Sequence, residues 1–414
     1  VIVRNCRLGL FPVFYYATAN EFGVSASVDR LLECGAPDDL DNDSLATFLR
    51  LGFLLGDETV FSSIKMLPPG GEVRWSGGEP RVTGGYFFQK SQHLSRKDAI
   101  DGYGELFRQA IARRSSDDVR FGLPLSGGRD SRHILLELIA QGHRPDVCYT
   151  NHDFPPYREE NIKVAGMLTK RLDLNQQIMG QPKSRLKAEV QKNRLNSYQA
   201  MENIWCISLY PAVAKRTPVI YEGLGGDILS AGMYLKREDA RLFEQGRLEE
   251  LAEQLVKRWS WRIPEDVLQR ILTEEAYQRF TRELAVENVS NELEKHRSAA
   301  SPMTSFYFWN RDRRVGALQP FAIAREAGIL AVTPYMDHDL VDFLLSLTAE
   351  MYMDHRFHTE TIHRMHPDFD DIPYAGDMGT SLIEDNWHYR RMLIELGVHL
   401  TMKGQMSLIR KGVT

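Results

Sequence analysis

The sequence predicts an α/β protein in which a parallel, doubly wound sheet is preceded by a small mixed α+β module and followed by a helical C-terminal part. Three observations carry this prediction. Strand-like and helix-like segments alternate from residue 119 onward, which is typical of a parallel sheet with crossover helices. Beyond residue 237, long charged amphipathic segments replace the strands. Residues 1–90 combine short β-like runs with one helical segment.

Composition places the chain among ordinary globular proteins of two-domain size. It has 414 residues, of which 43% are apolar and 26% are charged. The formal net charge of −5 gives no support for a nucleic-acid-binding surface. The four cysteines form no Cys-x-x-Cys pair, which argues against a disulfide framework or a thiolate zinc site and favours a cytoplasmic protein. No apolar run approaches the ~20 residues that a membrane span needs.

The first domain is expected to cover residues 1–92. Short β-like runs occupy residues 13–17 and 23–27, and a helical segment follows them. The glycine-containing stretch at residues 75–82 has the pattern of a hairpin. Because the chain begins with Val1 rather than Met, we expect a fragment or a processed chain.

The second domain is expected to cover residues 95–414 and to begin with an amphipathic helix at residues 95–114, for which Ser95 is a candidate N-cap. Strands and helices then alternate, and ligands of such sheets bind at the carboxyl ends of the strands. The further expected elements are strands at 119–125, 147–150, 172–174 and 218–221, and helices at 132–141, 159–168, 239–259, 264–296 and 321–328.

The stretch Ser-Gly-Gly-Arg-Asp-Ser at residues 126–131 lies between a predicted strand and a predicted helix, and we interpret it as a phosphate loop. Its two glycines let the backbone approach an anion, and the following helix points free N–H groups and its positive dipole end at the same place. Asp130 adds a carboxylate beside this loop. Since a carboxylate and a phosphate repel unless a cation lies between them, the stretch predicts a site for a nucleotide with Mg²⁺.

A second glycine-rich turn, Gly-Leu-Gly-Gly-Asp at residues 223–227, follows a later predicted strand. If this turn faces the first loop, Asp130 and Asp227 can hold one or two Mg²⁺ ions on the diphosphate portion of ATP while backbone amides hold its oxygens. By itself, the turn is equally well explained as a tight connection.

These residues resemble the asparagine synthetase-like family of N-type ATP pyrophosphatases. Residues 126–131 match that family's Ser-Gly-Gly-x-Asp-Ser loop, and residues 223–227 are similar to its second loop, in the form found in β-lactam synthetases. Thr-Pro-Tyr-Met-Asp at residues 333–337 resembles the family's Pro-Phe-Leu-Asp segment. The resemblance implies an adenine nucleotide alpha hydrolase-like sheet. It also implies that ATP and Mg²⁺ convert a carboxylate to an acyl-adenylate, that pyrophosphate leaves, and that an amine attacks to form an amide.

The resemblance also identifies candidate site residues. Those implied to bind ATP are Leu125, Ser126, Gly127, Gly128, Asp130, Ser131, Gly223, Gly225 and Gly226, and those implied to bind Mg²⁺ are Asp130 and Asp227. No catalytic residue is identified, because Leu224 occupies the position of the family's general-base Glu or Tyr, and the neighbouring Glu222 is out of register. The family's lysine has no counterpart at residues 372–380, and Lys403 and Lys411 are more simply solvated tail residues.

The amino-terminal module resembles the closing portion of the family's glutaminase-like, Ntn-type sandwich. Residues 4–16 and the Leu-Pro-Pro-Gly turn at residues 67–70 carry this resemblance. The family's nucleophile is a cysteine at the mature amino terminus, whereas Cys6 lies inside a late-strand motif. We therefore do not expect glutamine hydrolysis.

Other polar and aromatic residues are expected to have structural roles. The run Arg-Asp-Arg-Arg at residues 311–314 is expected to form a solvated helix face, with a carboxylate or phosphate clamp as the alternative. Four histidines near one helical stripe are expected at the surface, with a metal site as the alternative, and four tryptophans are expected in the core. These residues are His355, His358, His363, His366, Trp205, Trp259, Trp261 and Trp309.

Together these observations predict an AMP-forming, ATP- and Mg²⁺-dependent amide-forming ligase or amidotransferase-like enzyme. Its expected partners are a small-molecule or peptide carboxylate and an amine or ammonia donor. Neither nucleic acid nor a membrane is expected as a partner, and a homodimer is possible. One alternative is an intramolecular cyclase of the β-lactam synthetase or lasso-peptide type. The other is a degenerate nucleotide-binding protein without ligase activity, which the absent base and lysine favour.

Overall fold

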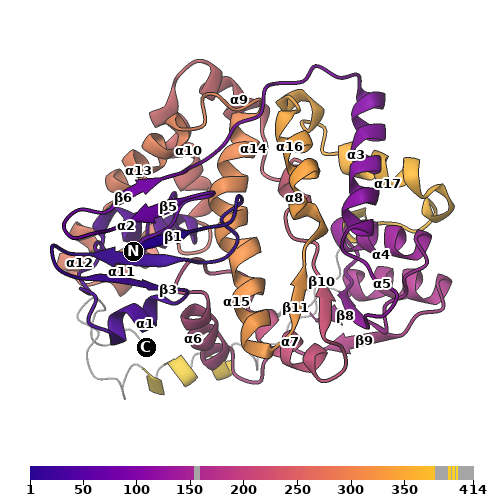
Figure 1. Cartoon of the computed structure of the whole chain (residues 1–414), viewed down its shortest axis with the longest axis horizontal. Coiled ribbons are helices and arrows are strands. Elements are labelled where there is room, and N and C mark those ends of the chain that lie inside the picture. The colour runs from indigo at the N-terminus through magenta and orange to yellow at the C-terminus, as the bar shows by residue number, and fades with distance from the viewer. Residues whose placement is uncertain (153–158, 378–389, 393, 397, 400–414) are drawn as a thin grey trace.

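A five-stranded parallel sheet forms the centre of the computed structural model, which describes residues 1–152, 159–377, 390–392, 394–396 and 398–399 (Figure 1). Every neighbouring pair of strands is parallel, in the order β11-β10-β7-β8-β9. The predicted parallel α/β fold is therefore confirmed. The strands are β7 (Phe121–Pro124), β8 (Val147–Asn151), β9 (Gln176–Met179), β10 (Val219–Tyr221) and β11 (Leu330–Val332).

Helices cover both faces of this sheet, as a doubly wound fold requires. Because side chains alternate along a strand, β10 sends Val219 and Tyr221 to one face and Ile220 to the other. The first two belong to the main core together with α4 and α5, whereas Ile220 packs in a second core with α7 and α15. These helices are α4 (Asp130–Ala140), α5 (Glu160–Arg171), α7 (Cys206–Ala214) and α15 (Leu318–Ala327).

The amino-terminal module consists of two small antiparallel sheets and two helices. The sheets have the strand orders β1-β5-β6 and β3-β2-β4. The hairpin expected at residues 75–82 is present, and its turn passes through Gly77 and Gly78 at positive φ. The elements are β1 (Ile2–Arg4), β2 (Phe14–Ala17), β3 (Phe22–Ser25), α1 (Val28–Glu33), α2 (Asn42–Leu51), β4 (Lys65–Met66), β5 (Glu72–Arg74) and β6 (Arg81–Thr83).

The rest of the described chain is almost wholly helical, but its long segments are more divided than expected. A turn at Gly246, with φ of +70°, splits the helix expected at residues 239–259, and the segment at 264–296 forms three helices. The helices are α3 (Arg96–Ala112), α6 (Arg185–Leu195), α8 (Gly226–Leu229), α9 (Arg237–Glu244), α10 (Leu248–Trp259), α11 (Glu265–Ile271), α12 (Glu274–Arg279), α13 (Arg282–Glu294), α14 (Pro302–Phe306), the π-helix Tyr307–Ala317, α16 (His338–Ser346) and α17 (Phe357–Met365).

The strand expected at residues 172–174 is wrong. Leu172 ends α5, and Asp173 has a φ of +50°, so the chain turns before β9 begins at Gln176. Leu172 and Leu174 contribute to the main core from this turn. None of the helices within the described ranges is long and apolar enough to cross a membrane.

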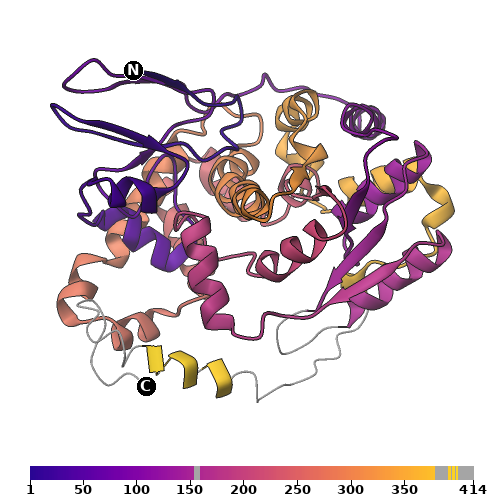
Figure 2. The same cartoon turned by 60° about the horizontal axis from the view of Figure 1, so that its bottom comes forward.

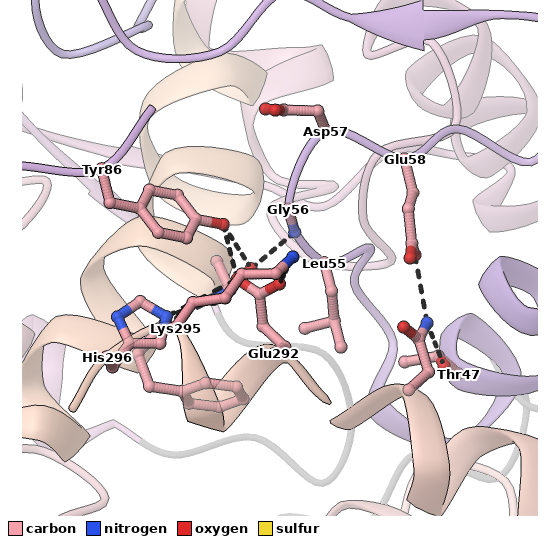
Figure 3. Close-up of polar contacts among 12 residues, drawn as sticks. Thr47, Leu55, Gly56, Asp57, Glu58, Tyr86, Glu292, Lys295 and His296 are labelled. Carbon is pink, nitrogen blue, oxygen red and sulfur yellow. Dashed lines mark hydrogen bonds and ion pairs between the residues drawn. The ribbon is translucent and has the colours of Figure 1, made fainter. Parts of the chain in front are cut away.

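The amino-terminal module shares the main core with the helical part of the chain. Leu8, Leu51 and Phe53 belong to this core, and Figure 2 shows the orange helices α14 and α15 lying between the small sheets and the parallel sheet. A partly buried polar cluster crosses the same boundary. The Tyr86 hydroxyl donates to Glu292 Oε1 at 2.6 Å, and Lys295 Nζ lies 2.7 Å from Glu292 Oε2 (Figure 3).

Candidate active site

Two hollows share a wall at the carboxyl ends of the central strands. The larger, here called the cleft, has a volume of about 380 Å³ and lies where β7, β8 and β10 end. The smaller, here called the side pocket, has a volume of about 120 Å³ and extends toward the π-helix. The order of the sheet reverses between β7 and β10, and ligands of open α/β sheets bind at this kind of switch point.

The structure brings the two predicted loops together around these hollows. Gly127, Gly128 and Gly226 belong to the same two loops but are not among the lining residues. The predicted site residues that line the cleft or the side pocket are Leu125, Ser126, Asp130, Ser131, Gly223, Gly225 and Asp227.

The first loop is held by side-chain oxygens of its own surroundings. The amide of Ser126 donates to Ser131 Oγ, and the amide of Gly128 donates to Ser126 Oγ, each at 3.1 Å. The amide of Gly127 donates to Asn161 Oδ1, also at 3.1 Å. These amides are the groups predicted to hold phosphate oxygens, so a phosphate that reaches them replaces internal acceptors.

Asp130 begins α4 and packs directly against the second loop. A Cβ atom built on Gly223 would lie 2.9 Å from Asp130 Cβ, and one built on Gly226 would lie 2.5 Å from Asp130 Oδ1. Only glycine leaves room for this carboxylate at both positions. Gly225 has a φ of +91°, which favours glycine, and it starts the turn that places Asp227 in the first turn of α8.

The two loops place negative charge close together. Burial raises the pKa of Asp130 well above its ordinary value, and the nearby Asp227 carboxylate raises it further. Asp312, on the π-helix, lines the same side pocket and has its pKa raised by burial and by Asp227. A cation that enters this region therefore relieves a carboxylate repulsion that the fold already contains.

Arg311 is the basic residue that faces these carboxylates. Its guanidinium lies 2.8 Å from Glu202 Oε2, 3.4 Å from Asp312 Oδ1 and 3.6 Å from Asp227 Oδ2. The expectation of a solvated face for residues 311–314 is wrong, because all four side chains are buried. The π-helix turns two of them toward the site and the other two toward the amino-terminal module, so none of the four reaches solvent.

His358 corrects a second expectation. It is fully buried beneath the first loop, with Nδ1 3.4 Å from Asp130 Oδ1 and 3.1 Å from Ser230 Oγ. Burial and the charge of Arg129 lower its pKa to about 3, so the ring is neutral. His366 is also buried, whereas His355 is exposed and His363 is half-buried.

The sequence reasoning missed one residue of the site and misjudged two others. Asn161, in the first turn of α5, was not singled out, and Glu222, considered out of register, follows β10 directly and lines the cleft. Trp205, expected in the core, is half-buried and lines the cleft, because it precedes the helix that covers this face. Its position directly after a predicted strand is a signal that could have placed Glu222 in the site.

The tryptophan and lysine expectations have mixed outcomes. Trp259 and Trp309 are buried in the main core as expected, but Trp261 is 70% exposed, because it follows the C-terminus of α10. Lys403 and Lys411 lie outside the described residues, as do residues 378–380 of the segment that lacks the family lysine.

A family model supports the class of protein that this fold and these loops define. The model for asparagine synthase matches residues 102–364, which is more than half of the chain. The chain therefore belongs to the asparagine synthase family.

Individual relatives are distant. The chain is 24% identical over 135 residues to a protein of Methanocaldococcus jannaschii named "Putative asparagine synthetase, glutamine-hydrolyzing, 2", a match that covers 31% of this chain and 26% of that protein. The matched part is thus about a quarter of that relative's length. Among solved structures, the U34-tRNA thiolase NcsA from Methanococcus maripaludis matches at 12% identity, covering 77% of this chain and 90% of that chain, with a TM-score of 0.26.

Proposed function

We propose that this protein is an AMP-forming ligase that uses Mg²⁺ and ATP to activate a carboxylate as an acyl-adenylate and then joins it to an amine. The observation that carries the proposal is the packing of the two glycine loops around Asp130 at the switch point of the sheet. A tight connection alone does not require two separate glycines to make room for one carboxylate. Membership of the asparagine synthase family supports the same reaction class.

The residues present fit Mg²⁺ bound together with a nucleotide. Within the described residues, no group of three or more His, Cys, Asp or Glu side chains is arranged to hold a metal ion by itself. Mg²⁺ commonly binds through one or two carboxylates, with substrate phosphates and waters completing its six ligands. Asp130 and Asp227 would supply the two carboxylates, and the bound ion would neutralise charge on the departing pyrophosphate.

The protein's own part in catalysis is then positioning. The loop amides and the amino-terminal end of α4 would hold phosphate oxygens. Leu125, Ile204 and Leu224 give the cleft an apolar wall that limits water near the reacting carbonyl. The acid would be a small-molecule or peptide carboxylate, and the nucleophile an amine or ammonia.

Pyrophosphate release tests the proposal. The full chain would be incubated with ATP, Mg²⁺ and a panel of carboxylic acids, with hydroxylamine to trap an acyl-adenylate as its hydroxamate. We expect pyrophosphate release that depends on the acid and a loss of more than about tenfold in Asp130→Asn. The matched control is Asp117→Asn, because the Asp117 side chain is 92% exposed.

Two results would count against the proposal. Unchanged pyrophosphate release in Asp130→Asn would remove the site assignment. Tight binding of ATP without pyrophosphate release with any acid would favour a nucleotide-binding protein, the alternative that Leu224 in the cleft wall supports.

A further inference from the structure

Glu222 places a carboxyl group inside the cleft, directly after β10. Its side chain is 3% exposed and lines the cleft together with Ser126, Asp130 and Leu224. Strand alternation puts Glu222 on the same face of the sheet as Ile220, which packs against α7. The carboxyl group is therefore fixed between α7 and the cleft.

A tyrosine on α7 holds this carboxyl group. The Tyr210 hydroxyl is fully buried and donates to Glu222 Oε1 at 2.6 Å. Cys206 lies one turn earlier on α7 and is also fully buried. Burial raises the pKa values of Tyr210 and Cys206 well above their ordinary values, so both stay neutral near pH 7.

The ionisation of Glu222 is shifted toward neutral pH. Burial raises the pKa of this carboxyl to about 8, and the hydrogen bond from Tyr210 opposes the shift by stabilising the carboxylate. Of the other titratable groups nearby, Cys206, on the same helix as Tyr210, interacts electrostatically with Glu222, and Asp130 and His152 line the same cleft. A buried carboxyl with such a shift in a cleft is a candidate for proton transfer.

We propose that Glu222 is the general base that takes a proton from the amine nucleophile of the ligase reaction. This inference rests on the proposed function and supplies the group that Leu224 cannot provide. Tyr210 holds Glu222 Oε1 and the residue lines the cleft, so Oε2 is the oxygen that would accept the proton. Leu224 is two residues away and contributes apolar surface to the same wall.

The step is a proton transfer followed by acyl transfer. The Glu222 carboxylate accepts a proton from the ammonium form of the nucleophile, and the freed lone pair attacks the carbonyl carbon of the acyl-adenylate. The C–N bond forms, the C–O bond to AMP breaks, and AMP leaves with the electron pair of that bond. The second N–H proton passes to water. A base whose pKa lies close to the working pH suits this transfer.

Comparison of two nucleophiles tests the role of Glu222. Hydroxylamine is largely unprotonated near pH 7 and needs no base, whereas ammonium chloride supplies a protonated nucleophile. Amide and hydroxamate formation would be measured from pH 6 to 9 with ATP, Mg²⁺ and a panel of L-aspartate, L-glutamate and acetate. In Glu222→Gln we expect the ratio of amide formation from ammonium to hydroxamate formation to fall by about 100-fold or more relative to the wild type.

Tyr210→Phe gives a second readout that does not depend on losing the base. Without the tyrosine hydroxyl, the Glu222 carboxylate is less stabilised, so the midpoint of the pH profile should move up by about one pH unit. Ser208→Ala is the control on the same helix, because the Ser208 hydroxyl donates to the Gly180 and Trp205 carbonyls and not to Glu222, and its midpoint should stay at the wild-type value. Thermal unfolding of each variant would establish that it is folded.

The outcomes separate this inference from the proposed function. Wild-type protein that releases no pyrophosphate with any acid would overturn both. Pyrophosphate release in the wild type, with equal losses of amide and hydroxamate in Glu222→Gln, would leave the ligase and remove the general base. An unchanged midpoint in Tyr210→Phe would also overturn the assignment.

Discussion

Gly226→Ala is the most direct test of how the second loop packs onto Asp130. A methyl group at this position would lie 2.5 Å from Asp130 Oδ1 and 2.9 Å from Tyr335 Cζ. Tyr335 cannot move freely, because it is fully buried and its hydroxyl donates to the Asp130 carbonyl at 3.2 Å. The clash therefore has to be relieved by the Asp130 carboxylate turning away or by the loop shifting.

The size of the effect follows from the cost of overpacking. Forcing a methyl group into a filled site typically costs about 1–3 kcal/mol. The free protein can lower this cost by moving the Asp130 carboxylate, but the nucleotide complex requires that carboxylate in place. Most of the cost then appears in binding, and since about 1.4 kcal/mol corresponds to tenfold, we expect Gly226→Ala to weaken binding by about 5- to 150-fold.

The assay is calorimetric titration of a non-hydrolysable ATP analogue in the presence of Mg²⁺. Gly180→Ala is the matched control, because a Cβ at Gly180 would have no atom within 4 Å although its neighbour Gln181 lines the cleft. Chemical unfolding of both variants would show whether the loss is global. Wild-type affinity in Gly226→Ala would refute the view that this loop and Asp130 form one binding unit.

Two further predictions concern the polar cluster at the boundary of the amino-terminal module (Figure 3). Tyr86→Phe should lower the free energy of unfolding, measured in urea, by about 1.5–3 kcal/mol, because the lost hydroxyl donates to the Glu292 carboxylate. The control is Tyr149→Phe, which removes a buried hydroxyl without a hydrogen-bond partner among the described residues and should change this free energy by close to nothing. Equal losses in the two variants would contradict the prediction. Burial raises the pKa of Glu292, but His296 and Lys295 outweigh burial and hold the pKa well below its ordinary value. The ionised Glu292 therefore stabilises the fold above about pH 4.3, and this stabilisation is lost as the pH falls. In urea unfolding from pH 6 to 3, the free energy of unfolding should fall less steeply in Glu292→Gln than in the wild type.

The elements that local sequence determines were predicted well. Ser95 caps α3 by accepting from the Asp98 amide, as the spacing of apolar residues and the cap position indicated. The loop at residues 126–131 connects β7 to α4 as predicted, because glycines and strand ends carry strong local signals. β9 was misplaced, since Gln176–Met179 is a short edge strand whose pairing with β8 decides its position.

Burial of charged residues was the main feature that sequence reasoning missed. The run at residues 311–314 and His358 look like surface residues by composition, and only tertiary contacts give them buried partners. The assignment of nucleotide and metal ligands stays a prediction, although the structure collects these residues at one place. Glu222 was judged out of register by comparison of loops, but it follows β10 directly and lines the cleft.

The π-helix Tyr307–Ala317 connects the amino-terminal module to the site. Asn310 Oδ1 accepts from the Gly56 amide at 2.7 Å, and the Arg313 and Arg314 guanidinium groups donate to the Gly56 carbonyl. Arg311, between them in sequence, reaches the carboxylates of the second loop. π-Helical turns are often found at functional sites. One short helical stretch thus makes both sets of contacts. Packing of the amino-terminal module against the π-helix therefore also fixes the orientation of Arg311 and contributes to the shape of the side pocket.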